Sequence, residues 1–192
     1  MLLTGAVYAS SDQAQQAFAQ GQFEQAIHYW GEVLKNTEAK NVPYLEAQLG
    51  SAIAYHALGA YKEAIDILIK ILPEAQRMTD KTWQVKILMA LGDSYLASQE
   101  KEAAGKKLQE AHTIAETIAD SFLSAEVFNK QGNWSTIASN FKEAKNLYKK
   151  SLQLAEEMSL RTRRVHPHMG QLESYSRRMD AIQARLNAIR GD

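Results

Sequence analysis

The segment Gly59-Ala60-Tyr61-Lys62-Glu63-Ala64 decides the fold, because related segments occur four times along the chain. The other three begin at Gly21, Gln99 and Ser139, so the four starting positions are separated by 38, 40 and 40 residues. A period of roughly 20 to 50 residues is typical of repeat architectures. An apolar-periodic stretch precedes each segment and a second one follows it, which predicts two packed helices per repeat.

The same periodicity predicts where the helices begin and end. A last helix, over about 168–190, has an apolar stripe with polar residues opposite, as expected of a terminal cap. Start signals for helices are present at Ser11-Asp12, Pro43 and Asp80. The predicted helix pairs are 11–20 with 23–36, 43–58 with 61–78, 80–97 with 101–118, and 121–138 with 141–159.

These repeats resemble the tetratricopeptide repeat family, whose pattern is L-G-x-x-Y, G-x-Y/F-x-x-A and A-x-x-x-F/Y. The third repeat departs from it with Gln99 and Lys101 at the turn glycine and the aromatic, and the fourth has Ser135 in place of tyrosine. Leu49-Gly50, Leu91-Gly92 and Gln131-Gly132 occupy the Leu-Gly place in the first helices. The second repeat matches best, through Ala52, Tyr55, Gly59, Tyr61, Ala64 and Leu68.

The resemblance implies an all-α, right-handed superhelical solenoid of four antiparallel helix pairs and a C-terminal capping helix. It would form a single domain over 1–192, with repeats in 10–159 and a linker and cap in 160–192. The spacing near 40 residues exceeds the family's usual value of about 34. Longer repeats of this kind resemble those of bacterial regulatory and secretion-associated members.

Composition and motifs narrow the function classes. The 22 basic residues balance 22 acidic ones, so we expect no nucleic-acid partner and no membrane insertion. The absence of cysteine excludes disulfides, thiol nucleophiles and thiolate metal sites. No catalytic or phosphate-binding motif is present, so we expect no enzymatic activity and no cofactor. His166 and His168 could share a metal ion, but two ligands make no zinc site, and a solvated turn is favoured.

Residues 1–9 leave the cellular location open. They resemble the end of a secretory leader with a small-x-small pattern at Val7-Tyr8-Ala9, although a basic start is lacking. The alternative is a short apolar cover on the first repeat. We expect a periplasmic or secreted protein in the first case and a cytoplasmic one in the second.

In a solenoid of helix pairs, the first helix of each pair lines the concave groove. Apolar anchors are expected in the second and third repeats, and Asn129 and Asn133 are expected to bond a peptide backbone. In the competing interpretation, the C-terminal helix fills this groove or its residues face water. The predicted groove residues are Leu49, Ile53, His56, Lys86, Met89, Asp93, Leu96, Glu126, Asn129, Lys130 and Asn133.

Other features suggest contacts outside the groove. Trp83 and Trp134 lie off the strict repeat pattern, which makes them candidates for partner contact. A basic cluster could contact an acidic partner, although a helix C-terminus also accommodates cations through its dipole. Its members are Arg161, Arg163, Arg164, Arg177 and Arg178.

Together these features predict a non-catalytic module that binds a peptide or helical segment of another protein. One alternative is a regulatory or sensor portion of a larger signalling or secretion system. Another is a structural subunit that associates with copies of itself, so homo-oligomers are possible.

Overall fold

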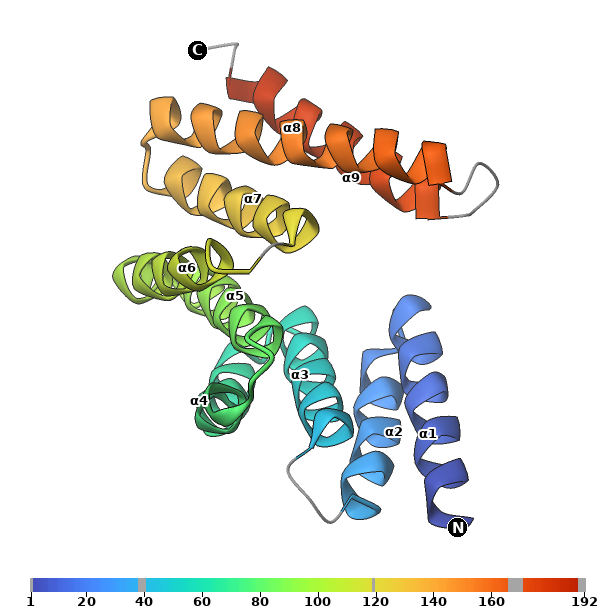
Figure 1. Ribbon diagram of the computed structural model, residues 1–192. Coiled ribbons are helices and arrows are strands. Elements are labelled where there is room, and N and C mark those ends of the chain that lie inside the picture. Colours follow the sequence, from blue (N-terminus) through green and yellow to red (C-terminus); the bar gives the residue numbers. More distant parts are fainter. Residues whose placement is uncertain (1, 38–40, 119, 166–170, 190–192) are drawn as a thin grey trace. The chain divides into compact units, whose positions relative to one another are not determined.

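The computed structural model describes residues 2–37, 41–118, 120–165 and 171–189, without the side chains of 159–165, 171–179 and several residues of 2–8. These residues form nine helices and no strand (Figure 1), which confirms the predicted all-α helical-repeat class. The helices are α1 (Leu2–Ala19), α2 (Phe23–Lys35), α3 (Val42–Ala57), α4 (Tyr61–Arg77), α5 (Thr82–Ala97), α6 (Lys101–Ala115), α7 (Ser121–Ile137), α8 (Phe141–Val165) and α9 (Gln171–Ile189).

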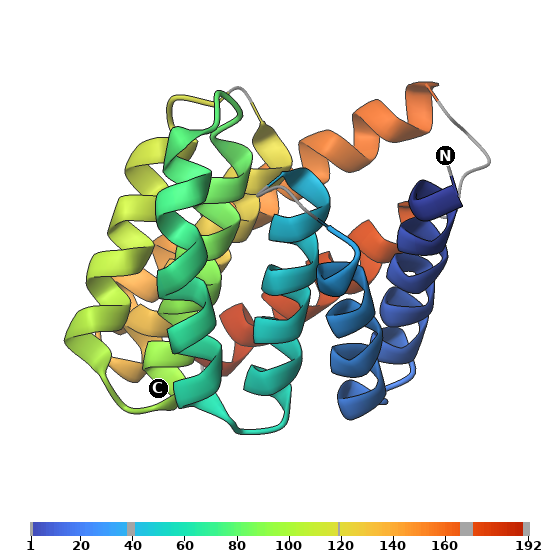
Figure 2. The same ribbon diagram turned by 90° about the horizontal axis from the view of Figure 1, so that it is seen from below.

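The chain divides into two compact units, Met1–Glu100 and Lys101–Asp192. The first contains α1 to α5, in which each helix packs against the next (Figures 1 and 2). The second contains α6 to α9, with α7 against α8 as its most extensive contact and α9 against α8. The division falls within the third predicted pair, at the turn where Gln99 and Lys101 depart from the family pattern.

Four left-handed turns mark the repeats. Gly21, Gly59, Gln99 and Ser139 have φ angles of 76°, 79°, 69° and 61°. Each lies two residues after the end of a first helix, and the backbone N–H of the next residue donates to a carbonyl five residues earlier, as Ala60 does to Tyr55 at 2.9 Å. This double-bonded ending satisfies carbonyl groups that a helix terminus otherwise leaves without a donor. Identical turn geometry in four places confirms the repeat register predicted from the sequence.

In the first, second and fourth pairs, small and large residues at fixed distances from these turns build the contact between the two helices. Five residues after the turn residue stands a fully buried alanine, and four residues beyond it a large buried side chain. The small alanine allows the two helices to approach closely, and the larger side chain fills the space beside it. The alanines are Ala26, Ala64, Ala104 and Ala144, and the larger residues are Trp30, Leu68, Leu108 and Tyr148.

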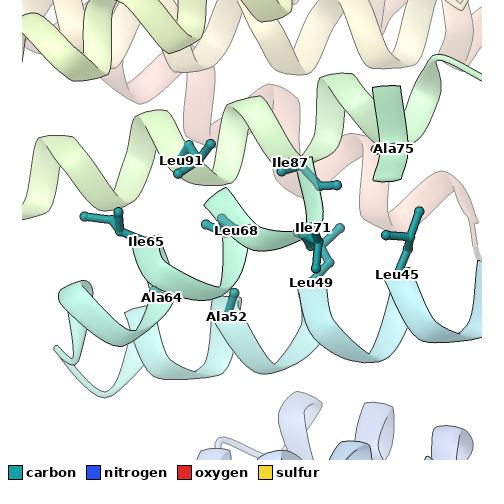
Figure 3. Packing of buried hydrophobic residues seen from close by; sticks show 10 residues of the cluster. All are labelled: Leu45, Leu49, Ala52, Ala64, Ile65, Leu68, Ile71, Ala75, Ile87 and Leu91. Atoms are coloured by element: carbon teal, nitrogen blue, oxygen red, sulfur yellow. The ribbon is translucent and has the colours of Figure 1, made fainter. Parts of the chain in front are cut away.

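The core of the first unit joins three helices. Side chains from α3, α4 and α5 interlock in one cluster, which Figure 3 shows. Leu68 and Ile71 of α4, Leu45 of α3 and Ile87 of α5 belong to this cluster, and all four are almost completely buried. Burial of a side chain of this size contributes about 1.5–3 kcal/mol to folding. This cluster therefore holds the second helix pair and the first helix of the third together.

Some predicted boundaries are wrong. Ser11-Asp12 lies inside α1, which begins at Leu2, because the residues before it continue the helix without a break. Helix α8 continues to Val165, beyond the predicted end at 159. The start at Pro43 is confirmed, and the Asn41 side chain caps that helix by accepting from the Tyr44 N–H at 3.2 Å.

Gly50 is also out of register with Gly92 and Gly132. Counted from the left-handed turn residue, Ala52 is its equivalent. Gly50 instead faces Trp30, whose ring would lie 2.4 Å from a Cβ atom at this position. The glycine therefore serves the contact between α2 and α3 rather than the contact within its own pair.

Candidate functional site

The first helices of the first unit lie next to one another. Gln15 Nε2 of α1 donates to Glu46 Oε1 of α3 at 2.8 Å, and His56 Nδ1 of α3 lies 3.2 Å from Ser94 Oγ of α5. These two contacts join α1 to α3 and α3 to α5 without any residue of a second helix. Glu46, Ile53 and His56 share one side of α3 because their spacing follows the helical repeat. The predicted groove residues of α3 are therefore on the side that faces other first helices.

Five of the predicted groove residues reach solvent on α3 and α5. Ile53 is 39% exposed, Lys86 is exposed, and the other three are partly buried. We call this surface the first-helix face, and it consists of Ile53, His56, Lys86, Asp93 and Leu96. It combines two apolar side chains with one acidic, one basic and one imidazole group. Such a surface can contact apolar and charged groups of a ligand together.

Neighbouring aromatic rings fix two of these side chains. The Lys86 ammonium lies 5.1 Å from the centre of the Trp83 ring, within the range of a cation–π interaction. The His56 ring lies 5.3 Å from the ring of Tyr61, in addition to its contact with Ser94. Trp83 is thus explained in part as the support of Lys86 rather than as an isolated ligand platform.

Leu49 and Met89 do not line the surface as predicted. Only 8% of Leu49 and 6% of Met89 is exposed. Leu49 belongs to the core cluster of α3, α4 and α5. The prediction failed because helical position alone does not show that neighbouring helices bury both side chains. Ile53 and Leu96 remain as the apolar residues of the first-helix face.

In the second unit, α9 lies over part of the predicted groove. Glu126, Asn129 and Lys130 of α7 line a cavity of about 280 Å³ together with residues of α8 and α9. Arg185 of α9 donates from Nη1 to Asn129 Oδ1 at 2.5 Å. Ile182 of α9 is buried against α8. At this repeat, Arg185 of α9 therefore engages one predicted groove residue, as the competing interpretation expects, although α9 packs mainly against α8.

Asn133 also has a partner within the chain. The Tyr148 hydroxyl donates to Asn133 Oδ1 at 2.8 Å, and Thr136 Oγ1 lies 3.3 Å from the same hydroxyl. The side-chain oxygens of Asn129 and Asn133 therefore both accept hydrogen bonds from other residues of the second unit. Sequence reasoning missed Arg185 as the partner of Asn129, because Arg185 lies off the apolar stripe of the last helix and the two residues are 56 positions apart.

The remaining candidates lie outside what the structure describes. The side chains of Arg161, Arg163, Arg164, Arg177 and Arg178 are in this group, as are His166 and His168. In the described part of the chain, no three His, Asp or Glu side chains are grouped to hold a metal ion. None of the helices as described is long and apolar enough to span a membrane.

Comparison with known proteins gives a match in the first unit. Residues 11–77 match the sequence profile of the tetratricopeptide repeat. This region covers the first two helix pairs, whose turns contain Gly21 and Gly59. A search of curated protein sequences gives no significant match.

Solved structures resemble the whole chain at low sequence identity. A Rap protein complexed with competence and sporulation factor is 16% identical, with a TM-score of 0.73 over 95% of this chain and 50% of that one. A putative kinesin light chain of Podosopora anserina with tetratricopeptide-like repeats is 17% identical, with a TM-score of 0.63 over 93% and 95%. MamA is 18% identical, with a TM-score of 0.54 over 94% and 93%. This chain thus spans about half the length of the Rap protein.

Proposed function

We propose that this chain, whose residues 11–77 match the tetratricopeptide-repeat profile, is a non-catalytic interaction module. It binds a peptide or helical segment of a partner protein on the first-helix face. The observation that carries the proposal is the 39% exposure of Ile53 on the side of α3 that faces the other first helices. An isoleucine at this place contributes little to the core, so its apolar surface is available to a partner.

The chemistry of the face suits an amphipathic segment. Ile53 and Leu96 would receive apolar side chains of the ligand, which provide most of the binding free energy. Lys86 and Asp93 carry opposite charges, so a segment with one acidic and one basic residue fits better than a uniformly charged one. A helical ligand would place its anchors three or four residues apart, and an extended one two apart.

The comparisons support an interaction role at the level of the fold. The Rap protein in the similar structure is complexed with competence and sporulation factor, so a protein of similar fold holds another molecule. The same similarity favours the second candidate, a sensor portion of a larger bacterial regulatory system, because this chain corresponds to half of the Rap protein. A third candidate is a subunit that associates with copies of itself.

A peptide selection tests the proposal. The full chain would be used to enrich binders from a random peptide library, and the dissociation constant of the best peptide would be measured by calorimetry. Ile53→Asp should weaken binding at least tenfold, which corresponds to about 1.4 kcal/mol. The matched control is Ile69→Asp on α4, because Ile69 is 49% exposed on a second helix. Circular dichroism would verify that both variants keep the wild-type helix content.

Equal weakening by both variants, or by neither, would show that the peptide binds elsewhere. Measurement of the molar mass over a range of protein concentrations separates the third candidate. If the molar mass of the wild type rises with concentration and that of Ile53→Asp stays at the value of a single chain, the first-helix face is a surface for self-association instead.

A further inference from the structure

A second cavity lies in the second unit, over α7 and between α6 and α8. Its volume is about 530 Å³, within the range of roughly 300–1,000 Å³ that small-molecule sites occupy. All of its lining residues belong to Lys101–Asp192, and none belongs to the first-helix face. The cavity is therefore independent of the surface to which the proposed function is assigned.

The cavity coincides with a departure of the fourth repeat from the second and third repeats. Ser135 lines it and lies four residues before the left-handed Ser139, where the second and third repeats have Tyr55 and Tyr95. Both tyrosines pack against the core of α3, α4 and α5. A serine at the same place leaves unfilled the volume that a tyrosine ring takes up, in the way that a large-to-small substitution does.

The aromatic walls of the cavity are held in place. The Trp134 N–H donates to the Lys101 carbonyl at 2.8 Å, and its ring lies against Gly105, where a Cβ atom would approach it to 2.6 Å. The Phe128 ring meets the His112 ring edge-on at 5.1 Å and has the Lys150 ammonium 5.3 Å from its centre. The walls are therefore preorganised, which lowers the entropy cost of binding.

Among the residues that the structure describes, two buried oxygens at the cavity have no hydrogen-bond partner. Gln131 is only 8% exposed and Ser135 is completely buried, and both line the cavity. The Gln131 amide nitrogen donates to Gln109 Oε1 at 3.3 Å, whereas Gln131 Oε1 and Ser135 Oγ are unsatisfied. Gln131 lines the cavity, and because the terminal torsion of glutamine is soft, its Oε1 can reorient towards a ligand there. Buried acceptors of this kind favour a ligand that brings an N–H or O–H group.

We infer that this cavity binds a small, flat aromatic molecule that carries an N–H or O–H donor. Its ring would lie between the Trp134 and Phe128 walls, and its donor would reach Gln131 Oε1. Two lysines and two glutamates at the cavity offset each other, so a neutral ligand fits best. They are Lys106, Lys150, Glu102 and Glu143.

Indole is a suitable probe, because it is neutral and flat and has one N–H donor. Titration of the full chain, followed by ligand-observed NMR, should give a dissociation constant below about 1 mM. 1-Methylindole lacks the donor and should bind at least tenfold more weakly, since it leaves the buried oxygen unpaired. 3-Methylindole has the same size as 1-methylindole but keeps the N–H donor, so it should bind with the affinity of indole. Equal affinity of the wild-type protein for 1-methylindole and indole would overturn the inference. Failure to bind indole would overturn it as well, because the cavity would then hold only water.

Two variants locate the site. Ser135→Tyr restores the residue of the equivalent repeats, fills the cavity and should abolish indole binding. Gln131→Leu should bind indole and 1-methylindole equally, because the acceptor is gone. Gln153→Leu, at an exposed position of α8, is the matched control and should keep the tenfold preference. Undiminished preference for indole in Gln131→Leu would refute the assignment of the donor, even if Ser135→Tyr fails to fold.

Discussion

Exchange of residues between the repeat turns tests whether the four turns are equivalent. Gly59 and Gln99 have nearly the same left-handed φ, 79° and 69°, and differ in whether a side chain is present. A non-glycine residue costs about 1–2 kcal/mol in this conformation. Replacement by glycine removes that cost, but it lowers the free energy of unfolding by about 0.4–1 kcal/mol because glycine gives the unfolded chain more conformational freedom. Gln99→Gly should therefore stabilise the protein by a net amount of about 0.5–1 kcal/mol.

The reverse exchange provides the matched control. A Cβ atom at Gly59 would meet no atom within 4 Å, so Gly59→Gln tests backbone strain without a steric clash. It should destabilise the protein by about the amount that Gln99→Gly gains. For a chain of this length, 1 kcal/mol moves the melting temperature by roughly 2–4 °C. We expect Gln99→Gly to raise it and Gly59→Gln to lower it, each by about 1–4 °C.

Thermal and urea unfolding, followed by circular dichroism, would measure both changes. A shift of the same sign in the two variants would refute the reasoning, and so would an unchanged melting temperature in both. Either result would mean that side-chain contacts, rather than the common backbone geometry, determine the stability of these turns.

Two further predictions concern α2, α3 and α5. Gly50→Ala places a Cβ atom 2.4 Å from the buried Trp30 ring and should destabilise the protein by about 1–3 kcal/mol in urea unfolding. In the control Gly31→Ala the added Cβ atom meets no atom within 4 Å, and this variant should stabilise the protein by up to about 1 kcal/mol. Equal effects of the two variants would contradict the packing of Trp30 against Gly50. Hydrogen bonding to Thr82 lowers the pKa of Asp80, so its stabilising effect is present above the unfolded-state pKa and is lost as the pH falls through the lower folded-state value. Asp80→Ala should therefore lower the melting temperature more at pH 7 than at about pH 2, and an equal loss at both would contradict the assignment.

The helices were predictable because one pattern recurs at a nearly fixed distance. Gln99 and Ser139 could be placed in the turn by register alone, although neither residue type favours a left-handed φ. The start of α1 was not predictable in the same way. The Ser11-Asp12 pair is a good capping signal, but a cap acts only where the preceding residues leave the helix, and here they continue it.

The site was less predictable than the fold, since burial depends on the neighbouring helices. Sequence position placed Leu49 and Ile53 on the same side of α3, yet Leu49 is buried and Ile53 is exposed. Asn129 was expected to contact a ligand, but its partner is Arg185, 56 residues away on another helix. The replacement of tyrosine by Ser135 was visible in the sequence as a departure from the pattern. The cavity that Ser135 lines could not be predicted, because its walls come from three helices, α6, α7 and α8.

Hydrogen–deuterium exchange with a selected peptide tests the central claim most directly. Binding on the first-helix face should slow amide exchange in α3 (Val42–Ala57) and α5 (Thr82–Ala97), because a bound segment restricts their opening. Exchange in α4 (Tyr61–Arg77) should change much less, since none of its residues belongs to that face. Protection confined to α4 or to the helices after Lys101, with α3 and α5 unchanged, would contradict the proposed binding surface.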